Sequence, residues 1–352
     1  MKKQINVLII DPHRSEFFWE PIANALAKET GFAVRIAKAP PFDLYRFDVI
    51  INVYLNELLR DLSHNTTDMP IIGVCMGTDA CVQSYTGTNS KRIKTVIAFN
   101  TNHQNLIKPD FKFSDHVLLD WPADDSRLFF QNRKPLTVTE GQPSTLRLLN
   151  IALHQYSKGL DNLIQQLADV SEDFPHKIEL HVIGSMGPFR DYNQYLNYYV
   201  QWFTSHKLDK SKFDFIYHGE QHPYKIDDYI ESIAPNAYIA SSQGEQGATS
   251  VSEGLIKGFN VFVQEHPFAD GLYTEFVVHA GEGENRRSIN DPERASKKGL
   301  HYYNTARDLG AQLKGFLDNP ADSATTREYG MGKFRMGKFI EGLVSVLRGA
   351  VK

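Results

Sequence analysis

Short apolar segments alternate with amphipathic segments along the whole chain, and this alternation constrains the fold more than any other feature. Each apolar segment is too short for an ordinary helix and ends at a turn, which is typical of buried parallel strands. In the first half these segments are Asn6–Asp11, Phe32–Lys38, Phe47–Val53, Pro70–Met76, Lys94–Asn100 and His116–Trp121. The second half has the corresponding segments Thr145–Leu153, Lys177–Gly184, Phe213–Gly219, Ala237–Ser241 and Phe259–Glu265. Strands that alternate with helices predict parallel sheets with helices on both faces.

The intervening segments have the periodicity of helices. Within Lys158–Val170 the apolar residues that share one face are Leu160, Leu163, Ile164 and Leu167. Further helices are expected at Glu20–Gly31, Tyr195–His206 and Thr249–Lys257. The C-terminal segment also predicts a helix, with one apolar side made of Phe339, Leu343, Val346 and Leu347.

A polar segment with proline and glycine, Phe129–Arg147, separates the two series of strands. It predicts an N-terminal Rossmann-like domain in residues 1–140 and a C-terminal Rossmann-like domain in residues 141–330. Residues 331–352 are expected to form a helix that returns to the N-terminal domain. The predicted fold class is α/β, with two doubly wound domains facing a central crevice, because ligands bind such sheets at the carboxyl ends of their strands.

The composition is that of a globular protein and excludes several classes of function. Of the 352 residues 41% are hydrophobic and 23% charged, and the net charge is −4. Double-stranded nucleic acid is not expected as a partner, because neutralisation of phosphates by a basic surface dominates that affinity. No apolar run approaches the roughly 18 residues of a membrane span, and no signal peptide is expected. The two cysteines, Cys75 and Cys81, fit a reducing cytoplasm.

The segment Ser241–Leu255 combines two glutamates with small and hydroxylated residues, a composition that is rare in a packed strand or helix. We expect a loop up to Thr249 and then the start of a helix, whose free backbone N–H groups form an anion site. Glu245 lies in the loop and Glu253 one turn into the helix, where a carboxylate can accept two hydrogen bonds from a vicinal diol. A diol beside a phosphate indicates a sugar nucleotide. The alternative is that a glutamate near a helix N-terminus only stabilises the helix dipole.

The same segment resembles the signature of retaining GT-B glycosyltransferases of the family 4 type. Both glutamates stand at the family's spacing, and Ser241 or Ser242, Gly258 and the strand Asn260–Val263 also match. Lys158 matches the family's lysine at the start of a helix. Two strand ends match as well, at Gly184 and Gly219, and the segments Pro70–Ala80 and His116–Phe129 resemble the family's N-terminal half more loosely.

The resemblance implies an enzyme that transfers a hexosyl or related sugar, with retention, from a nucleotide-diphosphate sugar to an acceptor hydroxyl. The implied products are polysaccharides, glycolipids or other glycoconjugates. The residues implied to be catalytic are Glu245, Lys158 and Asp79, and Asp79 fits a helix cap equally well. The residues implied to bind the sugar nucleotide are Glu253, Gly247, Ala248, Thr249, Ser242, Gly184, Gly219 and Glu220. Independently of the resemblance, His13 and Arg14 are expected to contact phosphate or acceptor from the first loop.

No cofactor is expected besides the sugar-nucleotide co-substrate. No metal is expected either, because no Asp-x-Asp motif follows a strand. The expected acceptor is a glycan, a lipid-linked compound or another hydroxyl compound, and the expected location is the cytoplasm. Basic residues around the terminal helix suggest contact with the inner face of the membrane, or simply solvated charges: they are Lys333, Arg335, Lys338, Arg348 and Lys352.

Three features depart from the family pattern. The first loop, Asp11–Phe18, lacks the family's Gly-Gly pair, and Ala152–His154 stands where the family has an arginine. Met76 occupies the position of a histidine that contacts the donor sugar in many members. Two alternatives therefore stay open: a catalytically silent GT-B-like partner subunit, and a GT-B sugar-nucleotide epimerase.

Overall fold

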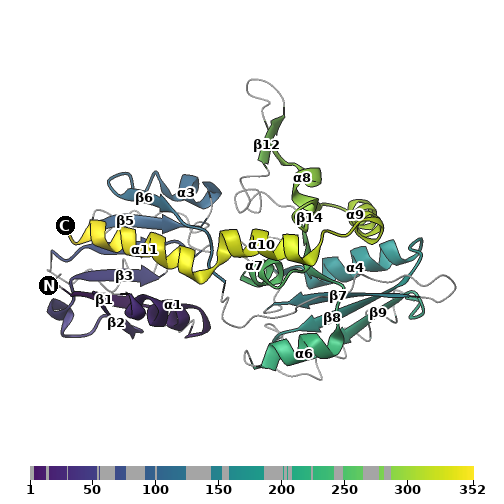
Figure 1. Ribbon diagram of the computed structural model, residues 1–352, viewed down its shortest axis with the longest axis horizontal. Coiled ribbons are helices and arrows are strands. Elements are labelled where there is room, and N and C mark those ends of the chain that lie inside the picture. Colours follow the sequence, from purple (N-terminus) through teal and green to yellow (C-terminus); the bar gives the residue numbers. More distant parts are fainter. Residues whose placement is uncertain are drawn as a thin grey trace. The chain divides into compact units, whose positions relative to one another are not determined.

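The computed structural model describes residues 4–12, 16–29, 31–53, 55, 68–76, 92–99, 101–123, 144–152, 158–185, 201, 204, 208–222, 225–241, 249–264, 277–280 and 287–352. Its contacts divide the chain into two compact units, Met1–Asp124 together with Lys333–Lys352, and Asp125–Gly332. Figure 1 shows the elements of each unit along the chain. The boundary predicted between residues 140 and 141 falls outside the described residues and stays a prediction.

The first unit is built on a six-stranded parallel sheet in the order β2-β1-β3-β4-β5-β6. Its strands are β1 (Ile5–Ile10), β2 (Phe32–Ala37), β3 (Val49–Val53), β4 (Ile71–Val74), β5 (Ile93–Ala98) and β6 (Asp115–Leu118). One face packs against α1 (Glu16–Lys28) and α11 (Met336–Ala350). The other face packs against the short helix η1 (Leu44–Arg46) and the end of α3 (Thr101–Ile107). Burial on both faces explains why the inner strands are continuous apolar runs.

The second unit is built on another six-stranded parallel sheet, in the order β14-β11-β10-β7-β8-β9. Its strands are β7 (Thr145–Ile151), β8 (Lys177–Ile183), β9 (Phe213–Tyr217), β10 (Ala237–Ala240), β11 (Asn260–Gln264) and β14 (Leu300–Tyr303). Its helices are α4 (Leu160–Ser171), α6 (Ile226–Ile233), α7 (Thr249–Ile256), α8 (Pro292–Ser296), α9 (Ala306–Asp318) and most of α10 (Ser323–Phe334). A small antiparallel hairpin consists of β12 (Val277–Ala280) and β13 (Arg287–Asn290).

The apolar periodicity predicted the buried face of α4 correctly. Its four predicted core residues, Leu160, Leu163, Ile164 and Leu167, are all buried, in one cluster with α9 and with alternate residues of β7 and β8. In Figure 1, α6 lies on the side of the sheet opposite α4. The helix predicted over Tyr195–His206 lies largely outside the described residues.

The sequence prediction missed β14, the sixth strand of the second sheet. Its second residue, His301, is buried, and its Nε2 is 2.9 Å from the Asn260 side-chain oxygen. The imidazole also stacks on Phe262, with ring centroids 4.6 Å apart. A histidine with these partners can lie inside a parallel sheet, but the partners come from another strand and leave no local periodic signal.

The C-terminal segment differs from the single helix that the sequence suggested. α10 ends at Phe334 and α11 begins at Met336, because the backbone of Arg335 is extended. At this break the Ala123 N–H donates a hydrogen bond of 2.8 Å to the Phe334 carbonyl. Beyond it α11 buries Phe339 and Leu343 in the core of the first unit.

Three glycines allow the close packing of α10 in the second unit. A Cβ on Gly258 would lie 2.4 Å from the Ser323 Oγ, and a Cβ on Gly299 would lie 2.3 Å from the Thr326 Oγ1. A Cβ on Gly330 would lie 2.6 Å from the Ile256 backbone nitrogen, so that α10 contacts the backbone of α7 directly. The first turn of α10 thus packs against Gly258 and Gly299, and its last turns pack against α7.

We expect Gly330→Ala to destabilise the protein by about 1–3 kcal/mol, because its methyl group would meet the backbone of α7 and force α10 outward. Gly332→Ala is the matched control in the same helix, since open space surrounds its Cβ position. Alanine is the better helix former there, so the control should gain roughly 0.5–1 kcal/mol. Urea unfolding of both variants measures this difference. Equal stability of the two would show that α10 does not pack tightly on α7.

Candidate functional site

The strand order of the second sheet identifies where a ligand is expected to bind. From β7 the chain continues to β8 and β9 on one side, and then returns to β10, β11 and β14 on the other. The order therefore reverses between β7 and β10, which pair in parallel through Leu148 and Leu149 of β7. In open α/β sheets, ligands bind beyond the carboxyl ends of the two strands at such a reversal. The candidate site is therefore the carboxyl edge of β7 and β10.

Lys158 and Ser241 meet at this edge. Ser241 follows β10 directly and is buried, and its hydroxyl donates a hydrogen bond of 2.7 Å to the Lys158 carbonyl. Gly159, which comes next, has a φ of 61°, in the left-handed region, and caps the start of α4. The bond and the turn fix the backbone of Lys158 at the end of β10.

Burial lowers the pKa of the Lys158 ammonium to about 8. The ammonium is disfavoured there because the surrounding protein replaces part of its water. An anion at this position would favour the charged form and gain a strong interaction with it, since local screening is weak. The environment of Lys158 therefore suits a phosphate ligand.

Tyr238 connects the end of β7 with the first turn of α7. Its side chain is fully buried, and its hydroxyl donates a 3.0 Å hydrogen bond to the Ile151 carbonyl and lies 3.4 Å from the Ile151 nitrogen. Burial raises the pKa of Tyr238, against opposing hydrogen bonds from Ser250 and Ile151, and the Glu253 charge raises it further. The Tyr238 hydroxyl is thus hydrogen-bonded to Ile151 of β7 and to Ser250 of α7, and the Glu253 charge is close enough to affect its pKa.

Glu253 lies one turn into α7, between buried neighbours. Ser252 and Leu255 are buried, whereas Glu253 itself is half-buried. The first N–H groups of an α-helix have no partner inside the helix, so the start of α7 at Thr249 offers donors to an anion. A carboxylate one turn further along can accept hydrogen bonds from hydroxyl groups of the same ligand.

Two glycines end the neighbouring strands at the same edge. Gly184 follows β8 with a φ of 135°, and Gly219 follows β9 with a φ of 74°. The Gly184 N–H donates a 3.0 Å hydrogen bond to the Gly219 carbonyl, and the Tyr217 hydroxyl donates a 2.8 Å bond to the Gly184 carbonyl. Both positions need glycine for their backbone conformation. Open space surrounds the Cβ position of Gly219, which leaves its backbone and the following Glu220 accessible.

The structure thus describes part of the predicted site. Lys158, Gly184, Gly219, Glu220 and Glu253 all lie at or just beyond the carboxyl edge of the second sheet. For Thr249 only the backbone is described, as the first residue of α7. The other predicted site residues lie outside the described residues and stay predictions: they are His13, Arg14, Asp79, Ser242, Glu245, Gly247 and Ala248.

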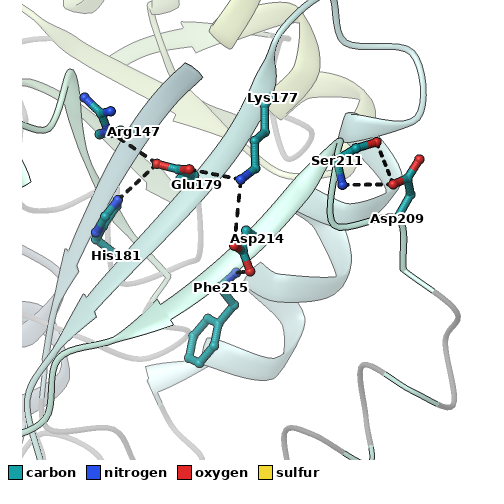
Figure 2. A network of polar contacts seen from close by, with 8 residues as sticks. All are labelled: Arg147, Lys177, Glu179, His181, Asp209, Ser211, Asp214 and Phe215. Carbon is teal, nitrogen blue, oxygen red and sulfur yellow. Dashed lines mark hydrogen bonds and ion pairs between the residues drawn. The ribbon is translucent and has the colours of Figure 1, made fainter. Parts of the chain in front are cut away.

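A polar network on the second sheet was not predicted. Glu179 of β8 accepts from Arg147 of β7 at 3.3 Å and from Lys177 at 3.0 Å, and Lys177 also lies 3.7 Å from Asp214 of β9 (Figure 2). Burial alone would raise the pKa of Glu179, but the hydrogen bond and charge of Lys177 lower it overall. The Arg147–Glu179 and Lys177–Asp214 pairs cross from strand to strand, so they stabilise the register of β7, β8 and β9, whereas Lys177 and Glu179 both belong to β8.

The same face carries two stacked histidines. His181 lies 3.5 Å from the Glu179 carboxylate, and its Nδ1 is 3.0 Å from the Nε2 of His218. Burial lowers the pKa of both rings, and the neighbouring His218 lowers that of His181 further. Among the described residues no group of three or more histidine, cysteine or acidic side chains could hold a metal ion. The contacts of His181 join Glu179 of β8 to His218 at the end of β9.

Comparisons with known proteins identify the fold. No family model and no curated protein sequence matches the chain. Solved structures do: sucrose-phosphate synthase from Thermosynechococcus elongatus has a TM-score of 0.67 at 14% identity, covering 99% of both chains. Anabaena HepE in complex with UDP has a TM-score of 0.68 at 11% identity, covering 98% of this chain and all of that one. Trehalose-6-phosphate synthase has a TM-score of 0.65 at 9% identity, covering 98% and 99%.

At such low identity these likenesses concern the fold. They extend over nearly the whole chain, and both six-stranded parallel sheets are present. The predicted fold class is therefore confirmed: the chain is an α/β protein with two doubly wound Rossmann-like sheets, of the GT-B type.

We expect Tyr238→Phe to destabilise the second unit by about 1–3 kcal/mol, because the Ile151 carbonyl would lose its buried hydrogen-bond donor. Tyr229→Phe is the matched control, since Tyr229 lies at the surface of α6 in the same unit. Chemical unfolding of the two variants measures the difference. If both lose the same small amount, the Tyr238 hydroxyl does not hold the end of β7.

Proposed function

We propose that the chain is a retaining glycosyltransferase that moves a sugar from a nucleotide-diphosphate sugar to an acceptor hydroxyl. The observation that carries this proposal is the arrangement at the carboxyl edge of β7 and β10. There the half-buried Lys158 has a lowered pKa, and its backbone carbonyl accepts a hydrogen bond from Ser241 at the end of β10; α7 with Glu253 is the next helix after β10. A cation, free backbone N–H groups and a carboxylate are the groups that a nucleoside diphosphate requires.

The structural neighbours support the nature of the ligand. Anabaena HepE has been solved with UDP, with UDP and glucose, and with UDP-glucose. The trehalose-6-phosphate synthase structure concerns glycosyl transfer with retention. We carry both properties over to this chain as part of the proposal, together with the family 4 resemblance of the segment from Ser241 to Val263.

Each residue has a role in the proposed reaction. Glu253 holds the ribose hydroxyls, and Glu245 holds the transferred sugar. Lys158 and the N–H groups of Ala248 and Thr249 stabilise the diphosphate as its charge develops, which is the largest contribution that such a site can make. The bond between the anomeric carbon and the phosphate oxygen breaks while the acceptor oxygen attacks from the same face. The acceptor proton passes to the leaving phosphate, so the reaction needs neither an enzymic nucleophile nor a metal.

The remaining predicted residues complete the site. Gly184, Gly219 and Glu220 border the nucleotide, and we assign Ser242 and Gly247, which precede α7 in the sequence, to the same ligand. Asp79 contacts the donor sugar or the acceptor. His13 and Arg14, which follow β1 in the sequence, contact phosphate or acceptor in this proposal. We propose the hexosyl class of donor sugar and a glycan, lipid-linked or other hydroxyl compound as acceptor.

A thermal-shift screen against the common sugar nucleotides tests the proposal, because a ligand that binds only the folded state raises the melting temperature. We expect one nucleotide to stabilise the protein and Glu253→Ala to weaken its binding about ten-fold, while folding is retained. The 2′-deoxy form of the same nucleotide makes the test specific. It should bind the unchanged protein more weakly, but should lose little further affinity in Glu253→Ala, because the two changes remove the same hydrogen bond.

Glu231→Ala, an exposed change on α6, is the control and should leave binding unchanged. The absence of any stabilising nucleotide would contradict the proposed function. Full binding by Glu253→Ala would contradict only the role of Glu253. Binding without release of nucleoside diphosphate in the presence of any acceptor would favour a silent subunit.

Lys158→Ala should lower kcat by about 100-fold and raise the donor KM much less, because the lysine charge is needed most when the diphosphate departs. Its pH dependence provides a second measurement. The lysine loses its proton as the pH rises through about 8. Since kcat/KM reports groups of the free enzyme, kcat/KM should be constant at lower pH and fall above pH about 8.

Lys158→Arg should retain part of the activity and lose this alkaline decline, because arginine stays charged throughout the range. Lys212→Ala is the control, since the Lys212 ammonium is exposed and donates to the Glu172 carbonyl. Near-normal turnover of Lys158→Ala would show that Lys158 is a structural residue.

A further inference from the structure

An exposed aromatic pair projects from the first unit, in the segment between β2 and β3. Phe42 is fully exposed and Tyr45 is 73% exposed, whereas most large apolar side chains of this unit are buried. Residues 35–46 comprise the end of β2, the following loop and the helix η1, and we call them the aromatic segment. Phe42 and Tyr45 stand three positions apart, and contiguous exposed apolar surface marks an interaction site.

The aromatic segment is anchored in the core of the first unit. Leu44, between the two aromatic residues, is buried in the core cluster that also contains Ile10 and Ile50. Two backbone hydrogen bonds of 3.0 Å close the short helix, from the Arg46 N–H to the Asp43 carbonyl and from the Phe47 N–H to the Leu44 carbonyl. The backbone that carries Phe42 and Tyr45 is therefore already ordered, so docking would lose little conformational entropy.

The aromatic segment also carries three cations. Arg35, Lys38 and Arg46 are all exposed, and the one acid of the segment, Asp43, lies 3.6 Å from Arg35 and 3.5 Å from Arg46. Three cations and one carboxylate give the segment a net charge of +2, in a chain whose total net charge is −4. The Arg46 guanidinium also lies 5.9 Å from the centre of the Tyr45 ring. The segment that carries the exposed aromatic side chains thus has an excess of positive charge.

A second exposed aromatic residue of the same unit provides a contrast. Phe113 is 70% exposed and has the Lys112 ammonium 5.2 Å from its ring centre. In residues 108–115, however, two lysines are balanced by two aspartates, so that surface has no excess of positive charge. The two sites share an exposed aromatic ring next to a cation and differ in net charge.

We propose that the aromatic segment docks the first unit on the surface of a bilayer that contains anionic lipid. Phe42 and Tyr45 would lie at the level of the headgroups, where aromatic side chains of membrane proteins concentrate. Arg35, Lys38 and Arg46 would lie against the lipid phosphates, each adding to the attraction. None of the helices in the described part of the chain is long and apolar enough to cross a membrane. The proposed contact is therefore peripheral.

The position of the aromatic segment also suggests what docking would achieve. β2 ends at Ala37, whose carbonyl accepts a 2.9 Å hydrogen bond from the Asp11 N–H at the end of β1. Docking would therefore bring the carboxyl edge of the first sheet to the membrane. If the proposed function holds, this edge is the acceptor side, and an acceptor carried by a lipid would be within reach. The docking itself does not depend on transfer activity and is tested without it.

Vesicle flotation of the full chain tests the proposal. We expect the protein to float with vesicles of phosphatidylcholine and phosphatidylglycerol and to stay behind with phosphatidylcholine alone. The double change Phe42→Ser and Tyr45→Ser should lower the partition coefficient about ten-fold or more, since two buried aromatic side chains are lost. Arg35→Gln with Arg46→Gln should abolish the preference for phosphatidylglycerol, and added salt should weaken binding of the unchanged protein.

Phe113→Ser is the matched control and should float like the unchanged protein. Thermal unfolding of each variant shows whether it is folded. Tyr45→Trp adds a direct readout, because indole emission should shift to the blue on addition of anionic vesicles and should be quenched by lipids brominated near the headgroup.

Three results would overturn the proposal: no flotation of the unchanged protein, undiminished flotation of the folded Phe42 and Tyr45 double variant, or equal loss in Phe113→Ser. A dimer in size-exclusion chromatography that the double variant loses would also overturn it, since the segment would then bind a second copy of the chain.

Discussion

The pairing of β7 with β10 is the constraint on which the candidate site depends. These two strands are far apart in sequence but adjacent in the sheet, and Tyr238 of β10 pairs with Leu149 of β7. That register places the Tyr238 hydroxyl at the end of β7 and the Ser241 hydroxyl at the Lys158 carbonyl. A shift of one residue would turn Tyr238 to the opposite face and break both hydrogen bonds. The positions of Lys158 and of α7 therefore follow from strand pairing and do not rest on loop conformation alone.

Much of the fold could be predicted because buried parallel strands leave a strong local signal. The inner strands of both sheets are continuous apolar runs, and the face of α4 follows from helical spacing. β14 left no such signal, because His301 becomes compatible with a buried strand only through Asn260 and Phe262 of β11. The break at Arg335 was missed for a similar reason, since the hydrogen bond between Ala123 and Phe334 joins segments that are distant in sequence.

Some residues of the candidate site could likewise be predicted from the sequence, and others could not. Glu253 was predicted from the composition of the segment Ser241–Leu255, and Lys158, Gly184 and Gly219 were predicted from their match to a family pattern. Tyr238 could not be found, because a tyrosine inside an apolar strand reads as an ordinary core residue. Its hydroxyl acquires a role only through the pairing of β10 with β7. The pairs of Arg147 with Glu179 and of Lys177 with Asp214 were likewise invisible, since each joins residues of neighbouring strands only after the strands are aligned.

The first unit is discontinuous in sequence, because it takes in residues 336–350 after the second unit is complete. Phe339, Leu343 and Leu347 of α11 fill the same core as Val7, Trp19 and Ile51, so the first sheet lacks part of its hydrophobic cover until α11 arrives. All residues of the second unit are therefore made before α11, while the first unit, although begun earlier, still lacks part of its core. Domains made first usually fold first. Here the unit that is made first is the one whose core is completed last.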